Sequence, residues 1–119
     1  MVVMDERMKR ELAHMAKISV YGSVWSSDPG IVNHSDYEGS IDVADVKPEQ
    51  DLTNIVDDKW WREDVGYKFA ALRLKELRPD GVVFTYGQTE IFAPFGQTTF
   101  IQEVGLSYAY GSLSVKVEK

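Results

Sequence analysis

The chain contains no cysteine and little histidine, and it has no long hydrophobic run. Its 119 residues include no Cys and two His. Disulfide bonds, thiolate metal sites and thiol catalysis are therefore excluded, as is a zinc site built from several histidines. No segment approaches the roughly 20 consecutive apolar residues of a membrane-spanning helix. We expect no metal, no other cofactor and no membrane contact.

The N-terminal residues do not resemble a targeting signal. A secretory signal has a basic start followed by an apolar run of about 7–15 residues, and the segment from Met1 to Arg7 has neither. Together with the lack of cysteine, this favours a cytoplasmic protein. A length of 119 residues suits one domain that buries a core without disulfide bonds. We expect residues 1–119 to form a single domain.

Recognisable catalytic motifs are missing as well, including glycine-rich phosphate loops and the zinc-protease and nucleophile-elbow motifs. One candidate cluster comprises His34, Asp36 and Glu38, with Asp42 nearby. An imidazole with carboxylates could hold a divalent ion or share a proton. However, such a pattern arises easily in an acidic loop. A small metal-dependent enzyme or ligand-binding domain is therefore our third interpretation, and we lean against an enzyme.

Charge is distributed unevenly along the chain. The formal net charge is −6, which argues against direct binding of nucleic acid. Residues 28–58 contain nine acids, and Lys47 is the one base among them. Residues 81–115 carry only Glu90 and Glu103. The chain thus has an acidic middle and an almost uncharged C-terminal third.

Periodicity predicts the elements of the first half. Met4, Met8, Leu12 and Met15 recur at helical spacing, so we expect an amphipathic helix over about 5–16. Its methionines should pack on a sheet; the alternative is an adaptable docking surface. Strict alternation predicts a strand over 18–25. We then expect a turn at 26–30, an irregular stretch to about residue 39 and a short strand near residues 41–43.

The second half predicts one long helix followed by strands. A short helix around residues 52–56 precedes a longer one, which begins at Asp57 or Asp58 and ends near Leu77. Its apolar stripe consists of Trp61, Val65, Phe69 and Leu72. Segments 82–86, 90–93, 98–110 and 112–118 are strand-like, with Gly87, Gly96 and Gly111 at the turns between them. We therefore expect an α+β fold in which an antiparallel sheet of about four to six strands, with a C-terminal meander, packs on one main α-helix plus an N-terminal helix.

The adjacent residues Trp60 and Trp61 are expected to have different roles, one at the surface and one in the core. Adjacent helical residues point about 100° apart, so both rings cannot readily enter one core. Trp61 shares the apolar stripe and should be buried. Trp60 is then a boundary residue or an exposed anchor of the kind found at interaction hot spots.

These observations favour a non-enzymatic, acidic protein-interaction module of the inhibitor or immunity type. Its partner would be a basic protein, for example one that itself binds nucleic acid, because complementary charge speeds association and selects the partner. The candidate contact residues are Asp36, Tyr37, Glu38, Asp42, Asp45 and Trp60. The alternative is a structural subunit of a viral or other homo-oligomeric assembly, built through the uncharged strands, which lack edge-protecting lysine.

Overall fold

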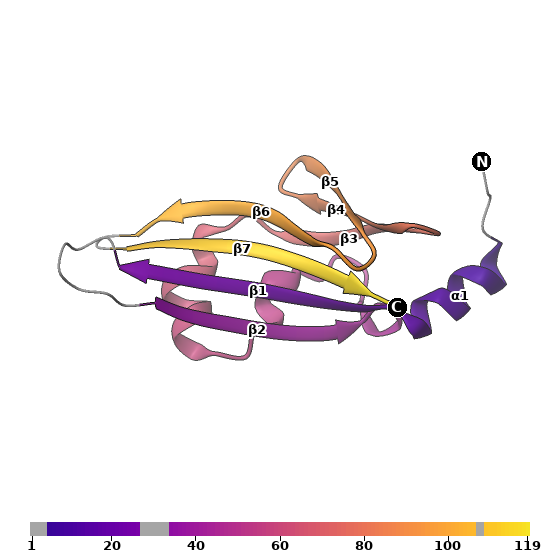
Figure 1. Ribbon diagram of the computed structural model, residues 1–119, viewed down its shortest axis with the longest axis horizontal. Coiled ribbons are helices and arrows are strands. Elements are labelled where there is room, and N and C mark those ends of the chain that lie inside the picture. The colour runs from indigo at the N-terminus through magenta and orange to yellow at the C-terminus, as the bar shows by residue number, and fades with distance from the viewer. Residues whose placement is uncertain (1–4, 27–33, 107–108) are drawn as a thin grey trace.

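The computed structural model describes residues 5–26, 34–106 and 109–119. These residues form two antiparallel sheets, one N-terminal helix and several short helical segments (Figure 1). The mixed helix-and-sheet composition expected from the sequence is confirmed. The elements are α1 (Glu6–Met15), β1 (Lys17–Ser26), β2 (His34–Asp42), η1 (Val43–Asp45), η2 (Leu52–Ile55), η3 (Trp61–Val65), η4 (Gly66–Lys68), β3 (Leu72–Arg78), β4 (Gly81–Tyr86), β5 (Thr89–Pro94), β6 (Thr98–Gly105) and β7 (Ala109–Glu118).

The larger sheet has the strand order β2-β1-β7-β6, and the smaller sheet has the order β3-β4-β5. In β1 and β7 every second residue is buried, as period-two alternation requires when one face meets the core. The short helical segments lie behind the larger sheet (Figure 1). The other face of that sheet is not covered by any element of the described ranges.

A single apolar core joins the two sheets to the helical segments. Its fully buried large side chains come from β1, β7, β3, β4, the segments η2 and η3, and the residue that follows η2: Ile18, Val20, Leu52, Val56, Trp61, Val65, Leu72, Val82, Phe84, Leu113, Val115 and Val117. The sheets also meet at Phe95, which forms a parallel bridge with Val117. The next amide, that of Gly96, donates to the carbonyl of Val117 at 2.8 Å.

The expected long helix to Leu77 is wrong, although its apolar stripe was identified correctly. Asp58 does accept from the amide of Trp61 at 2.9 Å and begins a helical segment. That segment ends with η4 at Lys68, and residues 72–78 form β3 instead. Residues 72–75 alternate between apolar and basic side chains, a pattern that fits a strand as well as a helix. Pairing with β4 makes this segment a strand. A register shift after Leu74 then brings Leu77 back towards the core.

The expected C-terminal meander is also wrong. β4 and β5 form a hairpin in the smaller sheet, whereas β6 and β7 belong to the larger one, where β7 pairs with β1. Gly87 does lie in the β4–β5 turn, with φ 58°, but Gly96, with φ 80°, lies at the corner where the chain changes sheets. Gly111 lies within β7, where a Cβ would be 3.2 Å from Val65.

The N-terminal helix forms as predicted, with Asp5 accepting from the amide of Met8 at 2.8 Å as its N-cap. Its methionine stripe does not pack on a sheet, because α1 projects from one end of the molecule (Figure 1). Met8 and Met15 are 44% and 63% exposed, and Met4 lies outside the described residues. No helix within the described part of the chain is long and apolar enough to cross a membrane.

The acidic middle of the chain contains a strand where an irregular stretch was expected. β2 begins at His34 and pairs with β1 along its whole length, from His34 opposite Trp25 to Asp42 opposite Lys17. The predicted turn at 26–30 lies mostly outside the described residues. Because alternate residues of a strand point to the same side, the carboxylates of Asp36, Glu38 and Asp42 share one face of β2.

Candidate interaction surface

The uncovered side of the larger sheet presents its outward side chains in cross-strand rows, and we call this side the open face. Antiparallel pairing sets residues of β2, β1, β7 and β6 next to one another. From β2 to β6, the three rows at one end are His34, Trp25, Tyr110 and Gly105; then Asp36, Ser23, Ser112 and Glu103; then Glu38, Tyr21, Ser114 and Phe100.

The first row contains a stack of three rings. The ring centroids of Trp25 and His34 are 4.8 Å apart with planes 5° from parallel. On its other side, Trp25 stacks on Tyr110 with centroids 5.5 Å apart and planes 28° from parallel. Partners directly across an antiparallel pair have side chains about 5 Å apart, which is why register alone brings these three rings together. The stack forms a stiff aromatic ridge on the open face.

Asp36 is held in place beside this ridge. Its Oδ1 lies 2.8 Å from Nε2 of His34 and accepts a hydrogen bond from the Ser23 hydroxyl at 2.7 Å. The carboxylate therefore lies between hydroxyl and imidazole. Serine nucleophiles need the imidazole in the middle, where it can take the hydroxyl proton. This trio therefore fixes the orientation of His34 and Asp36 and does not match a nucleophilic triad.

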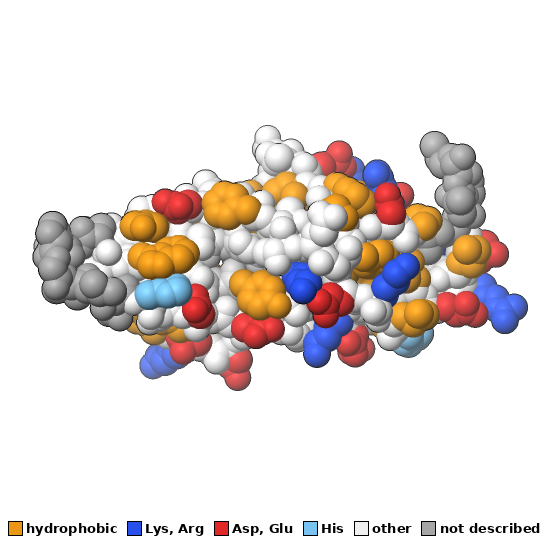
Figure 2. All heavy atoms as spheres, in the orientation of Figure 1, with side chains coloured by type: hydrophobic (Ala, Val, Ile, Leu, Met, Phe, Trp, Pro, Cys, Tyr) orange, Lys and Arg blue, Asp and Glu red, His pale blue; other side chains and the backbone are white. Residues whose placement is uncertain are grey.

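The three rows combine rings with carboxylates and contain no lysine or arginine. The nearest bases on this face, Lys17 and Lys116, lie in the rows beyond. Lys116 is paired with Glu118 at 2.7 Å, and this hydrogen bond raises the pKa of Lys116. Figure 2 shows this division, with apolar rings, a histidine and acids over one half of the sheet and basic groups mixed with acids over the other.

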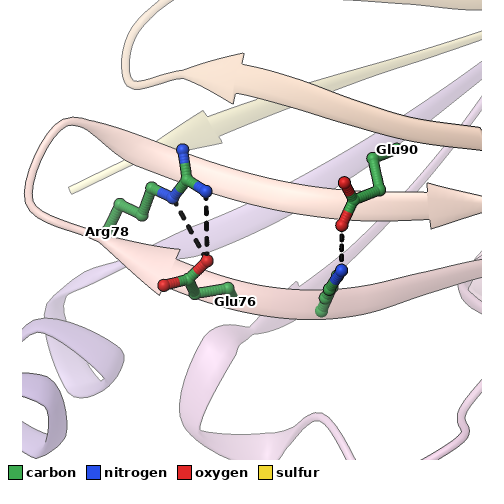
Figure 3. Close-up of polar contacts among 4 residues, drawn as sticks. Glu76, Arg78 and Glu90 are labelled. Atoms are coloured by element: carbon green, nitrogen blue, oxygen red, sulfur yellow. Dashed lines mark hydrogen bonds and ion pairs between the residues drawn. The ribbon is translucent and has the colours of Figure 1, made fainter.

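The smaller sheet offers a contrast, because its surface charges pair with one another. Lys75 on β3 reaches Glu90 on β5, and Arg78 lies 3.2 Å from Glu76 (Figure 3). The Arg78 guanidinium also lies 5.9 Å from the ring centroid of Phe92. On the open face, by comparison, Glu38 and Glu103 make no ion pair with any other described residue, so their charge is available to a partner.

The structure divides the six predicted contact residues among three places. Asp36, Glu38 and Asp42 share the open face, as alternation along β2 requires. Tyr37 points to the opposite side, and Asp45 lies in η1 beyond the end of β2. The sequence set therefore contains one coherent group of three carboxylates rather than a single six-residue site.

Tyr37 and Trp60 form a second, smaller group behind the β2 edge. Their ring centroids are 5.8 Å apart, and Trp60 is 45% exposed. Burial raises the pKa of Tyr37, and the carboxylate of Asp58 adds to that rise. Trp61, in contrast, is fully buried. The two adjacent tryptophans therefore differ in burial, as expected from the sequence.

Sequence reasoning missed the aromatic ridge. Trp25 and Tyr110 were not singled out, although Trp25 alternates with the buried Val24 and must face away from the core. A large ring on the polar side of an amphipathic strand is the signal that could have identified it. Tyr110 could not have been placed beside it without the β1–β7 register.

A metal site on β2 is not supported by the positions of its side chains. No group of three His, Cys, Asp or Glu suitable for a metal ion occurs within the described ranges. Same-face neighbours on a strand are about 6.6 Å apart, so His34, Asp36 and Glu38 do not converge on one point. Only His34 and Asp36 approach each other closely.

Comparison with protein-family models, with curated proteins and with solved structures finds no match. The functional interpretation therefore depends on the geometry of this chain.

Proposed function

We propose that the protein is a non-enzymatic interaction module, of the inhibitor or immunity type, that binds a basic protein through the open face. The observation that carries this proposal is the placement of Asp36, Glu38 and Asp42 on one exposed side of an edge strand. Asp36 and Glu38 lie in rows without a basic residue, and Asp42 lies in the row that also contains Lys17, so the negative charge is concentrated towards one end of the strand. Such a negative surface increases the rate of association and selects partners by charge complementarity.

A partner that extends around the free edge of β2 would also reach Trp60. This ring is half exposed and supported by Tyr37, and supported exposed tryptophans are typical energetic anchors of protein interfaces. The carboxylates would then steer the partner, and the tryptophan would retain it.

Matched charge reversals test whether the position of the carboxylates matters. The double variant Glu38→Lys with Asp42→Lys changes the open face, and Glu6→Lys with Asp80→Lys gives the same net-charge change elsewhere. Binding of fluorescein-labelled deca-lysine is measured by anisotropy at low and moderate salt. We expect the first variant to weaken binding about tenfold and the control to change it about twofold or less. Equal effects of both variants would show that only net charge matters, and we would abandon the proposal.

A second candidate is a homo-oligomeric structural subunit that assembles through β6. This edge strand carries one charged residue, Glu103, and its Phe100 is 59% exposed. Edge strands without lysine or proline readily pair with another chain. Light scattering on a sizing column, at low and moderate salt, distinguishes the candidates. A discrete oligomer that survives salt would favour assembly through β6, whereas a monomer at high concentration would contradict it.

A further inference from the structure

The ring stack of the open face ends at a glycine. His34, Trp25 and Tyr110 occupy the first three positions of their row, and Gly105 on β6 occupies the fourth. A Cβ added at Gly105 would have no atom of the described residues, which do not include 107 and 108, within 4 Å. Trp25 covers one face of the Tyr110 ring, and on the other side the row offers no side chain from the part of the chain that the structure describes. The row therefore has space for a fourth planar group.

The adjacent row supplies a negative charge beside that space. Glu103 precedes Gly105 by two residues on β6 and points to the same face, about 6.6 Å away along the strand. It is exposed and makes no ion pair with any other residue that the structure describes. The vacant position is thus bounded by an aromatic ring and an uncompensated carboxylate.

From this arrangement we propose that the position above Gly105 binds an arginine side chain of the basic partner, with its guanidinium stacked on Tyr110 and paired with Glu103. This inference rests on the proposed function and names the partner's contacting group. A guanidinium is planar and weakly hydrated, so it stacks on aromatic faces while it donates hydrogen bonds to a carboxylate. A lysine ammonium carries the same charge, but it is compact and strongly hydrated and would gain less from the ring.

Arginine selectivity is the measurable consequence. The probes are two synthetic decapeptides of equal charge, one with five Arg-Gly repeats and the other with five Lys-Gly repeats. Calorimetric titration of the unmodified protein should show about two- to fivefold tighter binding of the arginine peptide. Nuclear Overhauser contacts should join arginine side-chain protons to the ring of Tyr110. Equal affinities, or contacts to rings elsewhere, would overturn the inference.

Two variants test the position directly. Gly105→Val fills the vacant place without removing any group, and Tyr110→Ala removes the ring. Each should bring the ratio of arginine-peptide to lysine-peptide affinity close to one. Tyr67→Ala removes a ring that is 66% exposed on η4 and should leave the ratio unchanged. An arginine preference that remains in both Gly105→Val and Tyr110→Ala would overturn the inference. If one of these variants does not fold, the other variant and the selectivity of the unmodified protein still test it.

The outcomes distinguish the two proposals. If the Glu38→Lys, Asp42→Lys variant weakens both peptides equally but the unmodified protein shows no arginine preference, the acidic binding face stands and the arginine position is wrong. If that variant has no effect beyond its charge control, the proposed function fails, and any remaining arginine preference would belong to an isolated side-chain site.

Discussion

The indole of Trp61 lies directly against the backbone of Gly22: a Cβ built at position 22 would be 2.3 Å from the ring atom Cη2. Gly22 is on the inner face of β1, and Trp61 is fully buried beneath it. The large ring can approach the sheet this closely only because position 22 has no side chain. This contact sets the separation between the larger sheet and segment η3.

We expect Gly22→Ala to destabilise the fold because its methyl group would overlap a buried ring that cannot move away. Overpacking of this kind costs about 1–3 kcal/mol. The measurement is the free energy of unfolding in urea. Gly105→Ala is the matched control, because a Cβ there meets no described residue within 4 Å, and it should change stability by about 0.5 kcal/mol or less. Equal losses from the two variants would contradict the contact.

The adjacent tryptophans should differ strongly in their contribution to stability. Trp61→Ala removes a fully buried ring and should cost about 3–5 kcal/mol. Trp60→Ala removes a ring that is 45% exposed and should cost about 1 kcal/mol or less. Thermal unfolding of both variants under the same conditions checks this difference. A larger loss for Trp60→Ala would show that Trp60 has a structural role.

Asp51 should be important for joining η2 to β3. Its Oδ1 accepts from the amide of Thr53 at 3.0 Å, from the Thr53 hydroxyl at 2.8 Å and from the amide of Leu72 at 3.1 Å. Asp51→Ala leaves these donors without their acceptor, which should cost about 1–3 kcal/mol in urea unfolding. Asp51→Asn retains an acceptor oxygen and should lose less. If the two variants were equally unstable, the negative charge rather than the hydrogen bonds would be the important property.

Gly96→Ala should destabilise the corner between the sheets through backbone conformation alone. Gly96 has φ 80°, and within the described ranges no atom lies within 4 Å of its Cβ position. A left-handed backbone costs an L-residue about 1–2 kcal/mol, and Asn, which tolerates this region better, should restore part of the loss. Comparison of Gly96→Ala with Gly96→Asn by thermal unfolding tests the expectation. Full stability of the alanine variant would contradict it.

The Lys75–Glu90 pair predicts a local pH dependence. The hydrogen bond from Lys75, followed by its positive charge, lowers the pKa of Glu90. A carboxylate with a lowered folded-state pKa stabilises the fold above its unfolded pKa of about 4.3 and loses that contribution as the pH falls through the folded value. Because the pair is exposed, the effect on stability should be small. An NMR titration should show the pKa of Glu90 rising in Lys75→Met. An unchanged pKa would show that the pair does not persist in solution.

Sequence patterns alone predicted the features that depend on local chemistry and burial. The helix that begins after Asp5 and the strand around Val20 followed from capping and alternation. The buried positions Trp61, Val65, Phe69 and Leu72 were identified even though the predicted helix through Leu72 was wrong. The spacing of apolar residues identifies which side chains are buried. It does not identify whether a helix or a strand places them in the core.

The acidic middle of the chain was recognised from composition, but its shape was not. Residues 36–40 are mostly polar and contain glycine and serine, so their local pattern does not distinguish a solvated loop from an edge strand, and only the short strand near residues 41–43 was expected. Pairing with β1 supplies the hydrogen bonds that make them a strand. Once the strand exists, its alternation aligns Asp36, Glu38 and Asp42 and directs Tyr37 to the other side.

The sequence by itself determined the charge, the lack of thiol chemistry, the N-terminal helix and most of the core positions, because each depends on residue type or short-range spacing. Only the tertiary structure decided the division into two sheets, the strand at residues 72–78 and the row of Trp25, His34 and Tyr110. These depend on which distant strands pair and in what register, and cross-strand pairing brings together residues that are more than 80 positions apart in the chain, such as Trp25 and Tyr110.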